Sequence, residues 1–99
     1  MATVKGIHFV CRDDLNVTDS GDGTFETGVW VVAQKHLDDV EYIALHDAKD
    51  RLSYRHGRVL GWHHVDYEGR ERVVFVVRQE GPARAWIGGG SGEKGYAYR

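Results

Sequence analysis

The sequence predicts a mostly β domain, a small curled sheet or partly open β-barrel of five to six short strands with one or two short helical turns. Short runs of β-branched and aromatic residues alternate with segments rich in Gly, Asp and Ser. Almost no stretch has the periodicity of a long amphipathic helix. With 99 residues, the chain has the length of one domain, 1–99, with a single core. An α+β arrangement remains an open alternative.

The N-terminal half contains three strand candidates. The first two cover 4–11 (VKGIHFVC) and 28–34 (GVWVVAQ), and the second is apolar on both faces, as a central or barrel strand is. The segment between them, 13–27, lacks periodicity and is rich in Asp, Ser, Thr and Gly, so we expect a flexible acidic and glycine-containing loop there. A short helical turn over 35–40 and a third strand over 41–46 (EYIALH) follow.

The clearest structural signal is a β-hairpin formed by 58–65 and 72–78. A two-residue turn at Glu68–Gly69 would place two apolar pairs across its strands, Trp62 with Phe75 and Leu60 with Val77. The same register sets Asp66 against Glu71, which is unfavourable, so a longer loop or a bulge remains open. Gly61 lies in mid-strand and indicates a bend or a close backbone approach.

The C-terminal segment is rich in glycine, and we expect a loop over 88–95. Glu93 and Lys94 are adjacent opposite charges between glycines and aromatic residues, a combination suited to seat a ligand or to close over the end of a sheet. Tyr96 and Tyr98 alternate as in a short edge strand.

Charge is distributed unevenly along the chain. Residues 1–48 contain three basic and nine acidic residues, whereas 49–99 contain ten basic and six acidic ones. The densest basic run is the connector before the hairpin, with Lys49, Arg51, Arg55, His56 and Arg58. Clustered cations of this kind attract phosphates. The alternative is that the acidic and basic halves fold against each other as a mixed, solvated surface.

Histidine and cysteine patterns predict neither a metal site nor a cofactor. His63 and His64 are adjacent, so on a strand they point to opposite faces, and the chain lacks HExxH and close HxH spacings. The single cysteine, Cys11, rules out an internal disulfide and a cysteine-built zinc site. With no signal peptide visible and no apolar run of about 20 residues, we expect a cytoplasmic protein that does not span a membrane.

Three segments give the chain a resemblance to a known superfamily. They are GVWVV (28–32), YIALHDAKDRLSYRHGRVLGW (42–62) and RVVFVV (72–77). Their order, an apolar strand, a basic loop, and a GRVLG strand with its hairpin, resembles the PUA-like β-barrels, which include the EVE, ASCH and YTH domains. The resemblance implies a small barrel that binds RNA or DNA, often with an extruded or modified base in an aromatic pocket. The GxKxxExR signature of ASCH domains is missing, and no residue role is transferred.

The function we predict is a small nucleic-acid-binding module, because aromatic residues lie among and around the basic connector. Recognition of a single (modified) base is the finer form of this prediction. Phosphate contacts are assigned to Lys49, Arg51, Arg55 and Arg58. Stacking surfaces are assigned to Tyr54, Trp30 and Trp86, and a hydrogen bond to a base edge to His46 or His64. For Trp62, which faces Phe75, we expect a role in the core instead.

Two other functions remain open. The first is a protein-interaction or homodimerising domain that pairs through an exposed sheet edge, either the hairpin or Tyr96–Tyr98. The second is a small hydrolase-like enzyme that uses His46, Asp47 and Glu93 in a cleft below the glycine-rich loop. No residue is assigned a catalytic role from the sequence.

Overall fold

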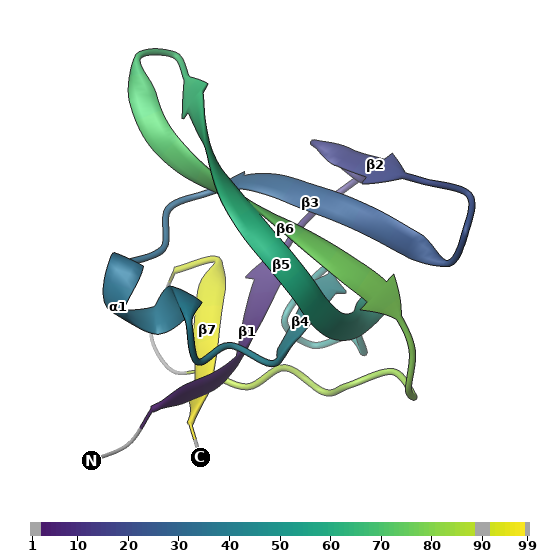
Figure 1. The fold of residues 1–99 in the computed structure, drawn as a ribbon. Coiled ribbons are helices and arrows are strands. Elements are labelled where there is room, and N and C mark those ends of the chain that lie inside the picture. The colour runs from purple at the N-terminus through teal and green to yellow at the C-terminus, as the bar shows by residue number, and fades with distance from the viewer. Residues whose placement is uncertain (1–2, 89–91, 99) are drawn as a thin grey trace.

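The computed structural model describes residues 3–88 and 92–98 and is mostly β, which confirms the predicted fold class (Figure 1). The described residues form seven strands, more than the five to six expected, and one four-residue helix. These elements are β1 (Val4–Val10), β2 (Val17–Asp19), β3 (Thr24–Trp30), α1 (Gln34–Leu37), β4 (Tyr42–His46), β5 (Arg55–Tyr67), β6 (Arg70–Gln79) and β7 (Lys94–Tyr98). No helix among the described residues has the length and apolar character needed to cross a bilayer.

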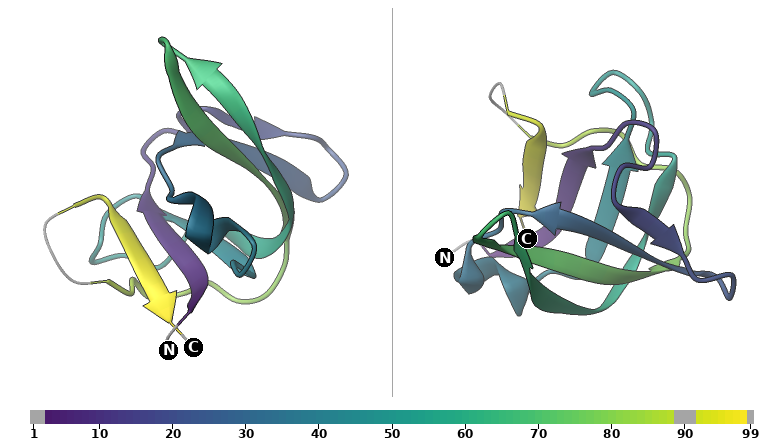
Figure 2. Two further views of the ribbon diagram at one scale, coloured as in Figure 1. Left: turned by 60° about the vertical axis from the view of Figure 1, so that its left-hand side comes forward. Right: turned by 90° about the horizontal axis from the view of Figure 1, so that it is seen from above.

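All seven strands belong to one mixed sheet, in the order β2-β3-β6-β5-β4-β1-β7. Only β1 and β4 pair in parallel, and every other neighbouring pair is antiparallel. The sheet curls strongly, so that β3 and β6 pass over the same interior as β1 and β4 (Figure 2). It stays open, with β2 and β7 as its two edges, and it does not close into a barrel.

The β5–β6 hairpin confirms most of the predicted register. Glu68 and Gly69 form its turn with positive φ angles of 54° and 78°, the backbone conformation of a type I′ turn. Trp62 lies opposite Phe75 as predicted. The prediction for Leu60 is wrong, because the register shifts between Val59 and Gly61 and it is Val59 that faces Val77. This irregularity is the bend that a glycine in mid-strand indicates.

The prediction of a structureless loop over 13–27 is wrong in part. β2 and the first residues of β3 pair antiparallel within it, from Val17 with Thr27 to Asp19 with Phe25. Phe25 and Thr27 are fully buried, so an inward-facing alternation was present in a segment whose composition is typical of a loop. The second strand, predicted over 28–34, is β3, which begins at Thr24 and ends at Trp30.

The predicted C-terminal loop ends earlier than expected, because β7 begins at Lys94. Of the expected range 88–95, residues 89–91 lie outside the described residues, whereas Lys94 and Gly95 already belong to β7. β7 pairs with β1 at the edge of the sheet, which confirms the edge strand expected around Tyr96 and Tyr98.

Side chains alternate along the strands between an interior and an outer face. On β1, Ile7 and Phe9 point into the interior, where the main core also contains Phe25, Leu37, Ile43, Leu45, Phe75 and Val77. Burying each of these side chains contributes about 1.5–3 kcal/mol. Trp62 packs against this core, as predicted. On the outer face, His8 forms hydrogen bonds with Tyr42 and His46. Trp86, in the segment after β6, packs against the rings of both histidines.

Two glycines of β5 provide a test of this packing. A methyl group on Gly57 would overlap the backbone carbonyl of Arg78 on β6, whereas a methyl group on Gly61 meets nothing within 4 Å. We therefore expect Gly57→Ala to lower the free energy of unfolding by about 3 kcal/mol or more, because backbone must move. Gly61→Ala should change it by less than about 1 kcal/mol. Urea unfolding of both variants measures the difference, and equal losses would contradict the described β5–β6 contact.

Candidate functional site

The structure does not bring the two tryptophans of the predicted stacking site together. Trp30 stacks on Phe9 with ring centroids 4.0 Å apart and an interplanar angle of 13°. Trp86 lies edge-on to His8 and His46, at 5.9 Å and 5.2 Å between ring centroids. Since Phe9 and His8 are neighbours on a strand, their side chains point to opposite faces. The two indoles are therefore on opposite sides of the sheet.

The cations of the connector are largely engaged within the protein. Arg55 forms a two-pronged ion pair with Asp14, with nitrogen–oxygen distances of 3.0 Å and 3.0 Å, and reaches Asp19 at 3.4 Å. Arg58 pairs with Glu80 at 3.5 Å. The acidic N-terminal half thus neutralises the central arginine of the run, which is the alternative that the charge distribution left open.

Lys49 and Arg51 lie in the loop after β4, on the side of Trp86. The Lys49 ammonium is 5.4 Å from the centre of the Trp86 ring. Arg51 contributes its backbone carbonyl, which accepts a hydrogen bond from Nδ1 of His46 at 2.8 Å. Tyr54 lies elsewhere again: its hydroxyl donates to the carbonyl of Cys11 at 2.6 Å, and burial raises the pKa of this phenol. None of these three residues reaches Trp30 in a recorded ring contact.

His46 belongs to a buried chain of hydrogen bonds. Because its Nδ1 donates to the Arg51 carbonyl, its Nε2 is an acceptor, and His8 Nδ1 donates to it at 2.9 Å. His8 Nε2 then accepts from the hydroxyl of Tyr42 at 2.8 Å. Burial lowers the pKa of His46, and burial together with the neighbouring His46 and Arg84 lowers the pKa of His8 to about 4. Both rings are neutral near pH 7.

The residues of the hydrolase alternative do not form an acid–base cluster. Both ring nitrogens of His46 are occupied in the buried chain, and its side chain is 0% exposed. Glu93 pairs with Arg12 at 3.4 Å. His64 lies on the hairpin, with Nδ1 3.3 Å from Glu71 and Nε2 3.2 Å from the side-chain oxygen of Gln34. Within 3–88 and 92–98, no three His, Cys, Asp or Glu side chains are arranged to hold a metal ion.

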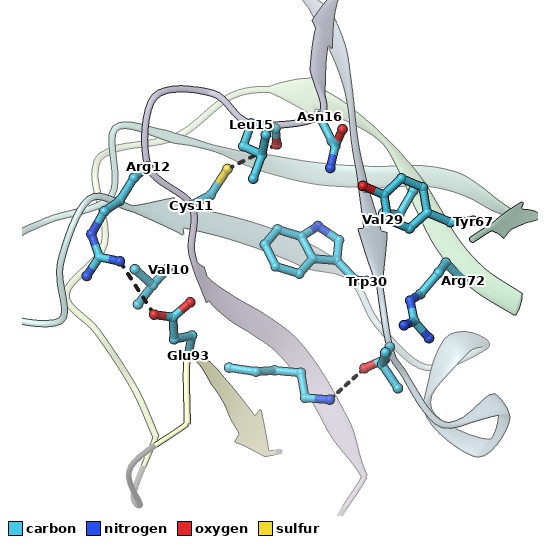
Figure 3. A pocket seen from close by; sticks show the side chains of 13 residues that line it. Val10, Cys11, Arg12, Leu15, Asn16, Val29, Trp30, Tyr67, Arg72 and Glu93 are labelled. Carbon is cyan, nitrogen blue, oxygen red and sulfur yellow. Dashed lines mark hydrogen bonds and ion pairs between the residues drawn. The ribbon is translucent and has the colours of Figure 1, made fainter. Parts of the chain in front are cut away.

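A pocket lies where β1 and β3 end, and Trp30 is at its centre (Figure 3). Its volume is about 570 Å³. The indole is held in place from two directions, because Phe9 stacks on it and its Nε1 donates to the hydroxyl of Thr27 at 3.1 Å. The remaining lining comes from several elements: Val10, Cys11, Arg12, Leu15, Asn16, Gly28, Val29, Val31, Tyr67, Arg72, Glu93 and Lys94.

Three cations surround this indole. Arg72 comes from β6, and among the described residues its side chain makes no recorded ion pair or hydrogen bond. Lys94 lies at the start of β7 and donates one hydrogen bond to the carbonyl of Val31 at 2.6 Å, which leaves two ammonium hydrogens available. Arg12 is bound to Glu93 in a pair whose side chains are both mostly exposed. The pocket is therefore locally positive in a chain of net charge −2.

The rim of the pocket exposes apolar surface. Leu15, Val31 and Tyr67 are 69%, 58% and 42% exposed, and all three line the pocket. Exposed apolar residues gathered around a concavity are typical of a binding site. Cys11 is not a candidate nucleophile there, because burial raises the pKa of its thiol and keeps it protonated.

Sequence reasoning identified Trp30 and noted Glu93–Lys94, but it missed Arg12, Tyr67 and Arg72 as members of one site. Arg72 was interpreted only as a strand residue. The sequence feature that could have identified Arg72 is its position close to the Glu68–Gly69 turn. A short turn in a long hairpin places the residues near the hairpin tip away from the main core.

Comparison of the chain with protein-family models, with curated proteins and with solved structures finds no match.

The ion pair of Arg55 provides a test of the connector. We expect Arg55→Ala to lower the free energy of unfolding by about 1–3 kcal/mol, because two charge-assisted hydrogen bonds to Asp14 are lost. Arg51→Ala, which removes an exposed side chain from the same run, should change it by less than about 0.5 kcal/mol. Denaturant unfolding measures both, and an equal response would show that the Asp14 pair does not stabilise the fold.

The buried histidines predict a pH dependence of stability. The ordinary pKa of a histidine is 6.5, and that of His8 is about 4 in the folded chain, so the unfolded chain binds protons more readily. The contribution of neutral His8 to the free energy of unfolding is therefore complete above about pH 6.5. This contribution is lost as the pH falls towards 4, and it changes little below pH 4. The difference amounts to about 3 kcal/mol for His8. Unfolding measured between pH 7.5 and 4 should show it.

A variant separates this effect from general acid sensitivity. His8→Gln removes the titrating ring and should flatten the profile between about pH 6.5 and 4. His63→Gln, which changes an exposed histidine, should leave the profile as in the original chain. If the His8 variant retained the full slope, the buried chain would not be its source.

Proposed function

We propose that this chain is a small binding module for single-stranded nucleic acid that takes one base onto the indole of Trp30. The observation that supports this most directly is the Trp30 pocket itself, a held aromatic surface within a hollow of about 570 Å³ bordered by Arg12, Arg72 and Lys94. This volume is in the range of ligand pockets, roughly 300–1,000 Å³.

The aromatic surface favours a planar ligand. One face of the indole is covered by Phe9, and the ring needs no rearrangement before a base approaches, because Thr27 fixes its nitrogen. Stacking of a base on an aromatic side chain contributes about 1–3 kcal/mol. The face of a base is accessible in a single strand but is covered by its neighbours in a duplex, so the site favours single strands.

The cations favour a ligand with phosphates. Arg72 and Lys94 come from different strands on the border of the pocket, and a planar guanidinium and an ammonium are both suited to phosphate oxygens. Two such contacts predict a slope of about −1.4 for log K against log salt concentration with a single strand. The net charge of −2 opposes non-specific binding, so affinity depends on this local group.

The proposal retains the predicted class of ligand but moves the site. Of the residues assigned to nucleic-acid binding from the sequence, only Trp30 lines the pocket. The resemblance to PUA-like domains implies an extruded or modified base as the ligand, and this finer assignment stays a prediction. The pocket's apolar rim of Leu15, Val31 and Tyr67 supports a base that lies flat between aromatic and aliphatic groups.

Binding of short single-stranded oligonucleotides, measured by fluorescence anisotropy at several salt concentrations, tests the proposal. Arg72→Gln should weaken binding and reduce the magnitude of the salt slope by about 0.7, because one phosphate contact is lost. Arg78→Gln is the matched control, since Arg78 lies six positions further along the same strand and does not line the pocket.

The aromatic contact has its own pair of variants. Trp30→Leu should weaken binding about ten-fold, whereas Trp86→Phe, on the opposite face, should leave it unchanged. Circular dichroism confirms that each variant is folded. The proposal is wrong if the original chain does not bind any oligonucleotide at low salt, or if the Trp86 variant loses affinity and the folded Trp30 variant does not.

A further inference from the structure

The two edges of the sheet differ in how well they are protected. β2 is three residues long and ends in Asp19, so it offers little backbone for pairing. β7 is five residues long, contains no proline and carries one charged side chain, Lys94. Natural proteins protect sheet edges with short strands, charges, prolines or bulges. By these criteria the outer edge of β7 is exposed to another strand.

The pairing with β1 determines which backbone groups of β7 face outwards. The amide of Val10 donates to the carbonyl of Glu93 at 2.8 Å, which marks Val10 and Glu93 as a hydrogen-bonded pair. Such pairs alternate along an antiparallel ladder, so Gly95 and Ala97 also direct their amides and carbonyls towards β1. The register shift between Val4 and Gly6 adds a residue to β1 and leaves β7 regular, so the corresponding groups of Lys94, Tyr96 and Tyr98 point away from the sheet.

Lys94 and Tyr98 lie at equal distances in sequence on either side of Tyr96, so a second copy of β7 can pair with the first about a two-fold axis at Tyr96. When two β7 strands run antiparallel with Tyr96 opposite Tyr96, Lys94 lies opposite Tyr98 at both ends. All three outward-facing residues of each copy are then paired, giving six backbone hydrogen bonds. A register centred on Lys94 would instead place two ammonium groups opposite each other.

We propose that two copies of this chain associate through β7 in this antiparallel register, which joins their sheets into one. The side chains agree with it. Tyr98 is 57% exposed, and its ring lies 6.4 Å from that of Tyr96 on the same face of the strand. In the pair, the Tyr98 ring lies beside the ammonium-bearing side chain of Lys94 from the second copy, a favourable cation–aromatic combination.

The face of β7 that carries Gly95 and Ala97 is already covered, so the second copy adds at the edge of the sheet and not on this face. Gly95 has no room for a side chain, because a methyl group there would overlap the carbonyl of Ile87. Ala97 is 7% exposed and packs with Tyr42 and Ala44. The segment after β6 thus already covers that face, and the free hydrogen-bonding groups remain in the plane of the sheet. Lys94 also lines the Trp30 pocket, where its ammonium donates to the Val31 carbonyl, but Tyr98 does not line it, so variants at Tyr98 test the β7 pairing separately from nucleic-acid binding.

Charges placed at Tyr98 test the register. In the proposed pair, Tyr98→Glu sets a carboxylate opposite Lys94 twice in each dimer, and Tyr98→Lys sets a second ammonium there twice. Both variants lose the tyrosine contact, so they are compared with each other: at about 0.2–1 kcal/mol for each of the two cross-strand pairs, the dissociation constant of the Glu variant should be at least about four-fold below that of the Lys variant. Sedimentation velocity of the full chain from about 10 μM to 1 mM measures it, since an interface of this size is weak.

Two charge variants elsewhere are the controls. Leu52→Glu and Leu52→Lys alter an exposed side chain in the connector and should leave the dissociation constant within two-fold of the original. In the original chain, hydrogen exchange at the Tyr96 amide should slow as concentration rises, because that amide becomes bonded only in the pair. A chain that is monomeric up to 1 mM, or equal dissociation constants for the Glu and Lys variants at Tyr98, would overturn the proposal.

Discussion

The alternation of side chains along β1 determines where the aromatic residues of this protein lie. Phe9 points into the curled sheet and supports Trp30, whereas the preceding residue, His8, points outwards and contacts Trp86. β1 is buried on both faces, between β4 and β7. Because one strand separates the two indoles, no rotation of side chains could place both on one ligand. The molecule therefore has an apolar interior that opens at the Trp30 pocket, and a separate polar layer around the histidines on its other face.

The position of the charges follows from the same curled sheet. β2 and the segment before it bring Asp14 and Asp19 to the start of β5, where both meet Arg55. Two carboxylates of the acidic N-terminal half thus compensate Arg55, and Glu80 compensates Arg58. Desolvation of such a pair is offset only when its hydrogen bonds are well formed, and the two-pronged geometry of Arg55 with Asp14 meets this condition. Arg72 is a cation that remains for a ligand, because it lies opposite Val65 and makes no ion pair among the described residues.

The sequence was informative where structure depends on neighbours in the chain. The turn at Glu68–Gly69 and the contact of Trp62 with Phe75 follow from local alternation and a single turn. The strand within 13–27 was missed because its inward-facing Phe25 and Thr27 are surrounded by residues typical of loops. The candidate site was largely missed for a different reason. Its walls come from residues 10–16, 28–31, 67–72 and 93–94, and only the curl of the sheet brings them together. No local pattern contains that information, so Trp30 was recognised as a residue but not as the centre of this pocket.

The β5–β6 hairpin connects the fold to the pocket. Its far end projects beyond the rest of the sheet (Figure 1), and Tyr67 and Arg72 on that end form one side of the pocket. The register shift between Val59 and Gly61 lies between this end and the part of β5 that pairs with β4. A bulge increases the local twist of a strand, so it sets the direction in which the hairpin leaves the sheet. Gly61 has free space where a side chain would be, which assigns the glycine to the bend and not to a close contact. The pairing of β3 with β6 then places the cation beside the indole, because Trp30 lies opposite Val73, the residue that follows Arg72.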